Sequence, residues 1–391
     1  MPKQVFLLAS AQALFQTASV LVMTVGGLAG AIVASREELA TLPVAAMFLG
    51  TAVATIPASL WMARAGRRAG FILGALLGLA GGVVAGLGMV HKSLLLLSLG
   101  TLLVGTYQGF AQFYRFAAAE VANPAFRPRA ISLVLAGGVV AAVVGPWLGR
   151  AGAAALDVEY AGSFAFLAAT AVLAILVLVP LRIPSAHPVA SMTVPRRPLR
   201  TIVRQPGYLV ALFGAATGYG VMILAMTATP LAMLHHDHHL RDAATVIQLH
   251  VLGMFLPSFF TGNLINRFGV VKVMLAGVLL LASHAVMTLS GTGFYSFAAA
   301  LVLLGVGWNF LYVGGTTLLT TTYHPSEKGT AQAFNDLSIF VIGLLSSLAA
   351  APLLRLLGWQ TLNVALLPWL GAAALALVWF MSSARVVTAS R

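Results

Sequence analysis

Twelve apolar runs of about 20 residues each follow one another along the chain, with only short polar breaks between them. Hydrocarbon offers a backbone no hydrogen-bonding partner, so a run of this length is stable in a bilayer as an α-helix. A soluble protein needs roughly a quarter of its surface residues charged, whereas 8% of these 391 residues are. The pattern therefore predicts an all-α membrane protein and excludes soluble enzymes and disordered scaffolds.

The runs also divide the chain. The expected transmembrane helices are residues 5–31, 42–62, 70–90, 94–116, 130–149, 161–180, 208–233, 246–265, 270–290, 294–319, 331–351 and 362–381. The longest polar stretch, residues 181–207, carries five Arg, five Pro and no acid, which is not the composition of a packed core. We expect it to be a basic cytoplasmic linker between a first half, residues 1–180, and a second half, residues 208–391.

The basic residues predict the orientation. If the N-terminus lies inside, sixteen of the 22 Lys and Arg fall on the inner side, five fall on the outer side, and Arg115 falls within a helix. Because Lys and Arg stay on the cytoplasmic side of a bilayer, we predict that both termini are cytoplasmic. The net charge of +13 is then a topology signal rather than a nucleic-acid site.

Two basic, glycine-containing turns indicate an internal repeat. Arg64–Arg68 follows the second run and Asn266–Gly269 follows the eighth, and Arg64 and Arg267 lie 203 positions apart. The same offset aligns Leu49–Gly50 with Leu252–Gly253. A two-fold repeat of six helices is typical of a membrane transporter.

These turns resemble the G-x-x-x-D-R-x-G-R-R loop of the major facilitator superfamily. Ser59 and Ala63 replace the first Gly and the acid in the first copy, while the second copy keeps Gly262 and has Asn266 in place of the acid. Together with the twelve-run plan, the resemblance implies the two-half fold of that family. It also implies transport rather than catalysis, and the sequence has no paired catalytic carboxylates, nucleophile motif or phosphate loop.

Soft metal ligands lie in two consecutive runs. Met222 and Met226 are in the seventh run, and His250 and Met254 are in the eighth. A spacing of four places each pair on one helix face, and similar depths would let Met226 face His250 and Met222 face Met254. Thioether and imidazole ligands without any Cys suit Cu(I) better than Zn(II), Fe(II) or Mn(II). The alternative is that the methionines fill gaps between helices and His250 bonds to a carbonyl.

The paired motif resembles the seventh-helix Met-x-x-x-Met and eighth-helix His-x-x-x-Met of the CcoA-like copper importers of the major facilitator superfamily. This resemblance implies copper import by alternating access across the bacterial inner membrane, for assembly of cbb3-type cytochrome oxidase. Copper would be the substrate, and no resident cofactor is expected. Two alternatives stay open, namely transport of an organic solute, such as riboflavin or a drug, and a membrane copper chaperone that binds metal without moving it.

The expected partners are the copper ion, the lipid bilayer and periplasmic or cytoplasmic copper chaperones. We expect a monomer that binds no nucleic acid.

Further candidate ligands lie outside this motif. The repeat offset maps Met226 onto Met23 and His250 onto Met47, so we expect these two residues to complete the coordination in one conformation. The loop after the seventh run would be either a capture site for incoming copper or an ordinary polar loop, and its histidines are His235, His236, His238 and His239.

Charged residues inside the apolar runs need partners. Arg115 and Asp336 both lie near the inner ends of their runs, which predicts an ion pair at an inner gate, with Arg64 as a further member. His284, in the ninth run, is expected to be a packed, hydrogen-bonded histidine.

Overall fold

The computed structural model describes residues 3–36, 39–40, 42–183 and 197–389, and no β-strand occurs among them. The helices before the linker are α1 (Lys3–Val33), α2 (Leu42–Ala65), α3 (Arg67–Val90), α4 (Leu94–Ala111), α5 (Tyr114–Val121), α6 (Arg127–Ala153) and α7 (Ala161–Leu178). A 3-10 turn, η2 (Pro124–Phe126), precedes α6. The prediction of an all-α chain is confirmed.

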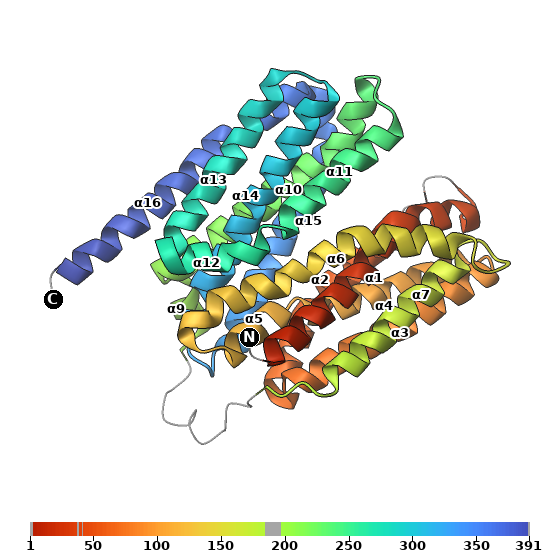
Figure 1. The fold of residues 1–391 in the computed structure, drawn as a ribbon, viewed down its shortest axis with the longest axis horizontal. Coiled ribbons are helices and arrows are strands. Elements are labelled where there is room, and N and C mark those ends of the chain that lie inside the picture. Colours follow the sequence, from red (N-terminus) through yellow and green to blue (C-terminus); the bar gives the residue numbers. More distant parts are fainter. Residues whose placement is uncertain (1–2, 37–38, 41, 184–196, 390–391) are drawn as a thin grey trace. The chain divides into compact units, whose positions relative to one another are not determined.

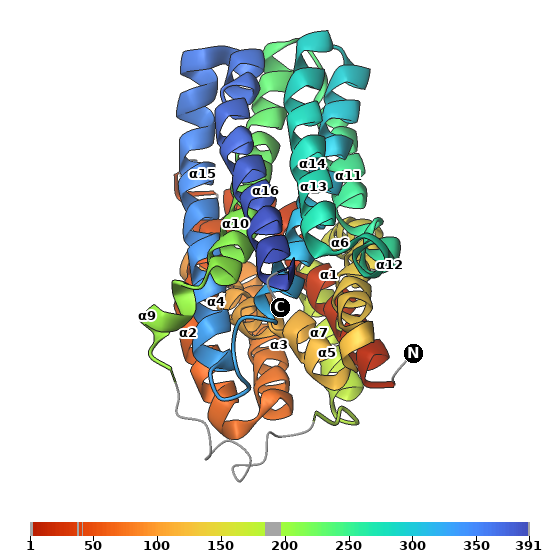
Figure 2. The same ribbon diagram turned by 90° about the vertical axis from the view of Figure 1, so that its left-hand side faces the viewer.

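The remaining helices are α9 (Leu199–Val203), α10 (Pro206–His235), α11 (Leu240–Phe255), α12 (Ser258–Phe268), α13 (Val270–Met287), α14 (Phe294–Leu319), α15 (Lys328–Val364) and α16 (Leu367–Ala389), with a 3-10 turn, η3 (Thr288–Ser290), after α13. In this part of the chain, α13 packs side by side with α14 and α16 (Figures 1 and 2). In the earlier part, α3 packs against α4 and α7 (Figure 1).

The predicted runs all coincide with helices, but the fourth and the eighth runs are interrupted. The fourth run breaks at Gln112–Phe113, between α4 and α5, and the eighth breaks at Leu256–Pro257, between α11 and α12. Pro257 has no amide hydrogen to continue the helical bonding. Among the described residues, eleven apolar helical stretches are long enough to cross a membrane. The last, Lys328–Ser383, has 56 residues, which is enough for two crossings. Its first helix breaks at Gly358, where φ is 72°.

The chain forms two compact units whose boundaries differ from the predicted halves. The first unit holds the described residues of 1–123, 133–194 and 328–337, and the second holds those of 124–132, 195–327 and 338–391. The first turns of α15 therefore belong to the first unit, and η2 with the first residues of α6 belongs to the second. Residues 184–196 of the predicted linker lie outside the described residues.

Glycines allow two helix pairs to approach closely, one in each unit. A Cβ atom on Gly105 of α4 would overlap the carbonyl oxygen of Met47 on α2. A Cβ atom on Gly305 of α14 would lie 2.6 Å from the carbonyl oxygen of His250 on α11. Met47 and His250 are the pair that the 203-residue offset relates. The same helix contact thus recurs in the two units, with the two glycines 200 positions apart.

The two basic turns also share one backbone conformation. Gly66 has φ 92° and ψ 153°, and Gly269, 203 positions later, has φ 88° and ψ 149°. Residues with a side chain rarely adopt such a φ, so glycine at this point is required in each turn. The internal repeat that the sequence indicates is therefore visible in the geometry of the turns.

Candidate functional site

The contact between α11 and α14 positions a buried histidine. His250 is fully buried, and its Nδ1 lies 2.8 Å from the carbonyl oxygen of Leu301. A carbonyl oxygen accepts, so Nδ1 carries the proton and Nε2 presents a lone pair. Nε2 has no hydrogen-bond partner among the described residues. An unfilled acceptor at this depth is suited to bind a ligand.

A buried asparagine holds together the broken eighth run. Asn309 of α14 donates from Nδ2 to the carbonyl oxygen of Met254 at 2.7 Å and to Oγ of Ser258 at 2.6 Å. Its Oδ1 accepts from Oγ1 of Thr261 at 2.7 Å. The side chain therefore ties the last turn of α11 to the first turn of α12 across the break.

Five aromatic rings from four helices form a continuous column in the second unit. Phe255 of α11 lies edge-on to Trp308 of α14, with ring centroids 5.7 Å apart. Trp308 stacks on Tyr312 at 4.9 Å with an interplanar angle of 15°. Tyr219 of α10 follows at 6.3 Å from Tyr312, and Phe340 of α15 lies 5.8 Å from Tyr219. In this aromatic column, Phe255, Trp308 and Tyr312 are buried, whereas Tyr219 and Phe340 are partly exposed, and aromatic rings of this kind stack on planar ring systems.

One polar atom of the aromatic column is left without a partner. Nε1 of Trp308 is buried, and no acceptor lies within hydrogen-bond distance of it in the described part of the chain. A buried indole N–H normally finds an acceptor. Trp308 Nε1 and His250 Nε2 are therefore an unsatisfied donor and an unsatisfied acceptor on the adjacent helices α14 and α11.

The predicted copper ligands of the second half are buried to different degrees. Met222 is 3% exposed and Met254 is 8% exposed, while Met226 is half-buried. The one protein hydrogen bond of the His250 ring points to α14, not to α10, which carries the two predicted methionines. The pairing of Met226 with His250 and of Met222 with Met254 stays a prediction.

The repeat-related methionines differ from each other. Met47 is buried in an apolar cluster with Leu21 of α1 and Val104 of α4, whereas Met23 is 43% exposed. Their role as additional copper ligands stays a prediction.

The loop histidines are used to cap and to pack. His238 donates from Nε2 to the carbonyl oxygen of Thr292 at 2.7 Å and lies edge-on to Phe297. His239 forms a capping box with Asp242 at the start of α11. His235 ends α10 and His236 is its C-cap. In the chain as described, no three His, Asp or Glu side chains gather in a metal-binding arrangement. The capture of copper by this loop stays a prediction.

The predicted pair of Arg115 and Asp336 is in contact. Nη2 of Arg115 lies 2.6 Å from Oδ1 of Asp336, and the side chains are 2% and 1% exposed. Asn335 also donates to Asp336 Oδ1 at 2.9 Å, and the guanidinium lies over the ring of Phe116. Arg64, which we had placed beside this pair, is exposed and forms no ion pair within the described residues. The part that these residues play in a gate stays a prediction.

The buried arginine of the turn is Arg67, which the sequence analysis missed. Its Nη2 lies 2.8 Å from Oε1 of Glu120 and also donates to Gln332, while Nζ of Lys328 lies 2.7 Å from Oε2 of Glu120. Ser59 donates to the carbonyl oxygen of Gly329 at 2.8 Å. The missed signal was Glu120, which is the one acid between residues 39 and 156.

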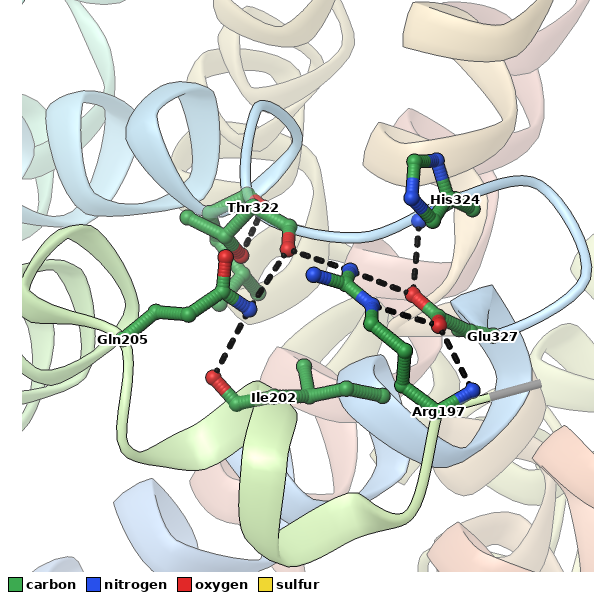
Figure 3. Close-up of polar contacts among 7 residues, drawn as sticks. Arg197, Ile202, Gln205, Thr322, His324 and Glu327 are labelled. Atoms are coloured by element: carbon green, nitrogen blue, oxygen red, sulfur yellow. Dashed lines mark hydrogen bonds and ion pairs between the residues drawn. The ribbon is translucent and has the colours of Figure 1, made fainter. Parts of the chain in front are cut away.

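A further ion pair attaches the end of the linker to the loop between α14 and α15 (Figure 3). Arg197 donates from Nε at 2.8 Å and from Nη2 at 2.7 Å to the two carboxylate oxygens of Glu327. Gln205 and Arg197 both donate to the carbonyl oxygen of Thr322, at 2.9 and 3.2 Å. The hydrogen bonds from Arg197 are the main cause that lowers the pKa of Glu327 to about 2.

The end of the linker is therefore ordered. Residues 199–203 form α9, and Ile202 is 1% exposed. The buried carboxylate of Glu327 accounts for this order, because it binds both the side chain and the backbone N–H of Arg197. An open hollow of about 850 Å³ at the ends of α13 and α14, lined by residues such as Met287, Phe294 and Leu303, includes none of the predicted site residues.

The sequence comparisons agree with this geometry. The profile of the Major Facilitator Superfamily matches residues 5–249 and, in an overlapping match, residues 211–390. The chain is 41% identical over 368 residues to the riboflavin transporter RfnT of Brucella anthropi, which covers 94% of this chain and 92% of the relative. It is 32% identical over 340 residues to the uncharacterized MFS-type transporter YddS of Bacillus subtilis, covering 82% of this chain and 78% of the relative.

Solved structures share the fold. The human organic anion transporter MFSD10 superposes with a TM-score of 0.76 at 14% identity, covering 96% of this chain and 100% of that one. The Escherichia coli fucose:proton symporter FucP superposes with a TM-score of 0.75 at 14% identity, covering 96% and 98%. The twelve-helix plan, the repeated turns and the matched profile agree, and the chain belongs to the major facilitator superfamily, whose members are multi-pass membrane transporters.

Proposed function

We propose that this transporter imports an organic solute with a planar aromatic ring system, of the riboflavin class, by alternating access across the inner membrane. The observation that carries the proposal is the aromatic column with its unpartnered Trp308 Nε1 and the neighbouring unpartnered His250 Nε2. The extended similarity to a protein named as a riboflavin transporter supports the substrate class.

The chemistry of the column suits such a solute. Stacking of a planar heterocycle on an aromatic side chain contributes about 1–3 kcal/mol per ring. The fused ring system of riboflavin carries carbonyl oxygens and a ring N–H at its edge. Trp308 Nε1 would donate to a carbonyl oxygen, and His250 Nε2 would accept from the ring N–H. Each of these hydrogen bonds contributes about 0.5–1.5 kcal/mol.

Copper ions are a second candidate substrate, favoured by a separate observation on His250. A metal-binding histidine usually donates its other ring N–H to a carbonyl or carboxylate, and His250 donates Nδ1–H to Leu301. Met254, four residues later on α11, and Met222 and Met226 on α10 would supply thioether ligands suited to Cu(I).

One set of variants separates the two substrates. Purified protein in proteoliposomes is assayed for uptake of labelled riboflavin and, in parallel, of labelled copper under reducing conditions. Trp308→Phe keeps a ring and removes the N–H, so we expect the riboflavin KM to rise about two- to tenfold. Met254→Leu keeps the volume and removes the sulfur, so riboflavin uptake should not change.

The matched controls are Trp379→Phe and Met381→Leu, both on α16. Trp379 is 54% exposed and lies outside the aromatic column. If the Trp308→Phe variant takes up riboflavin as well as the Trp379→Phe variant does, the proposed contact is refuted. Copper is the substrate instead if the wild type takes up copper, the Met254→Leu variant does not, and the Met381→Leu variant still does.

A further inference from the structure

The open hollow of about 850 Å³ lies where α13 ends and α14 begins, two helices that pack side by side (Figure 2). Its lining includes the small residues Gly293, Ala298 and Ala299, which leave room between larger neighbours such as Met287 and Leu303. None of the ten described residues that line the hollow is charged. A space of this chemistry suits an apolar occupant, because a charged group placed there would lose its water without gaining a partner.

The hollow is continuous with the lipid-facing surface of the second unit. Both helices belong to apolar stretches long enough to cross a membrane. Next to the lining residues Met287 and Ser290 in the chain, Val286 and Leu289 are 54% and 56% exposed. Tyr295, at the start of α14, is 85% exposed, and tyrosine at the end of a spanning helix is typical of the membrane–water interface. The hollow therefore begins at one surface of the bilayer and is filled by what the bilayer supplies.

The two ends of the hollow differ in polarity. At the end near the membrane surface, the hydroxyl oxygens of Ser290 and Ser296 lie 2.9 Å apart, whereas Val302 and Leu303 line the other end. Leu303 is nine positions after Phe294, the first residue of α14, so the hollow extends about 14 Å along the helix. This length is about half of a hydrocarbon core of about 30 Å. The occupant is therefore polar at one end, apolar at the other, and as long as one leaflet is thick.

We propose that the hollow binds one phospholipid of that leaflet, with an acyl chain along α14 and the glycerol region at the two serine hydroxyls. A flexible acyl chain follows an irregular concave surface and makes more van der Waals contacts there than on a flat helix face. A spanning helix of a partner or of a second copy would need a groove across the whole core, about 30 Å. Since no lysine or arginine is among the lining residues, the acyl chain is recognised rather than the headgroup charge. The proposal does not rest on the substrate that the protein transports.

Photolabelling tests the site. The protein is reconstituted in vesicles of phosphatidylcholine with a trace of phosphatidylcholine that carries a diazirine near the end of one acyl chain, and labelled peptides are identified by mass spectrometry. Leu375 is the comparison, because it is 72% exposed and lies eight residues after the start of α16, which begins on the same side of the membrane as α14. A few additional van der Waals contacts change occupancy by about fivefold, so Val302 and Leu303 should carry about five times the label of Leu375. Equal labelling in the wild type would overturn the proposal.

Two variants separate the hollow from the rest of the lipid-facing surface. Ala299→Leu fills part of the hollow, so the label on Val302 and Leu303 should fall to the level of Leu375. Ala169→Leu, at an exposed position of α7, adds the same side chain elsewhere and should leave the labelling unchanged. If Ala299→Leu keeps the full label, the lipid does not lie in the hollow and the proposal is wrong.

Two further measurements test the occupant. Vesicles of phosphatidylglycerol should give the same ratio of labelling, and enrichment with this anionic lipid alone would contradict recognition of the acyl chain. Native mass spectrometry should show a lipid retained on the protein. A dimer that excludes the label would mean that a second copy of the chain covers the hollow, which would also overturn the proposal.

Discussion

The contact between α2 and α4 allows a sharp test of how this fold is held together. Gly105 faces the backbone of Met47, where a Cβ atom would overlap the carbonyl oxygen and lie 2.7 Å from the carbonyl carbon. Backbone cannot turn aside as a flexible side chain can. Thr51 spans the same contact, because its Oγ1 lies 3.0 Å from the carbonyl oxygen of Met47 and 3.1 Å from that of Gly105. Gly105→Ala must therefore push the two helices apart.

The size of the effect follows from these contacts. Forcing an extra methyl group into a packed site costs about 1–3 kcal/mol. Weakening the Thr51 hydrogen bond costs about 0.5–1.5 kcal/mol more. Alanine recovers about 1 kcal/mol through its higher helix propensity. The net prediction is a loss of about 2 kcal/mol in the free energy of unfolding.

The control has the opposite sign. Gly27, on α1, has no atom within 4 Å of an added Cβ, so Gly27→Ala gains the helix propensity without a clash. Both variants are unfolded in mixed micelles by a rising fraction of denaturing detergent. Unfolding is followed by tryptophan fluorescence, since the chain has six Trp. If the Gly105→Ala variant has the same free energy of unfolding as the Gly27→Ala variant, the close approach of α2 and α4 is refuted.

Two further predictions concern ion pairs. Arg115→Met or Asp336→Leu alone leaves a buried charge unpaired and should lower the free energy of unfolding by about 3–5 kcal/mol. The double variant removes both charges and should be less destabilised than either single variant. Additive losses of stability in the same unfolding assay would contradict the pairing. Glu327 has its pKa lowered from 4.5 to about 2. Its ionised form therefore stabilises the fold above pH 4.5, and this contribution, about 1–2 kcal/mol after solvent screening of Arg197, is lost as the pH falls towards 2. The melting temperature should fall as the pH is lowered in the wild type and in the exposed control Arg200→Gln, whereas Arg197→Gln should not show this fall. An unchanged curve of melting temperature against pH in Arg197→Gln would contradict the pairing of Arg197 with Glu327.

The membrane helices could be predicted from the sequence because span length is a local property. An apolar run of sufficient length has one stable conformation in hydrocarbon. The breaks at Gln112–Phe113 and Leu256–Pro257 were missed because each lies within an apolar run, whereas Gly358 lies in the gap between the runs predicted at 331–351 and 362–381. Asn309, about 50 residues after the second break in the chain, supplies the side chain that bonds across it.

The part of the site that could be predicted from the sequence is the buried ion pair, because a charged side chain inside the membrane needs a partner of opposite charge. Arg115 and Asp336 are both charged residues in apolar runs, and each needs the other. Arg64 is exposed, whereas Arg67, three residues later at the start of α3, is buried and pairs with Glu120. The ring of His284 bonds to the carbonyl oxygen of Ala300 and to the side chain of Asn363, and Asn363 is 79 positions away. No local pattern could reveal that arrangement.

The place of residues 328–337 in the first unit has a consequence for how the protein is made. Arg115 is 221 residues ahead of the Asp336 that neutralises it. At about 5–20 residues per second, the ribosome needs roughly 10–45 s to synthesise that interval. Throughout this time the first unit lacks its last ten residues, and the guanidinium must be solvated by water or lipid headgroups. Membrane insertion of the first helices therefore precedes completion of their buried charge network, which closes only when the eleventh span emerges.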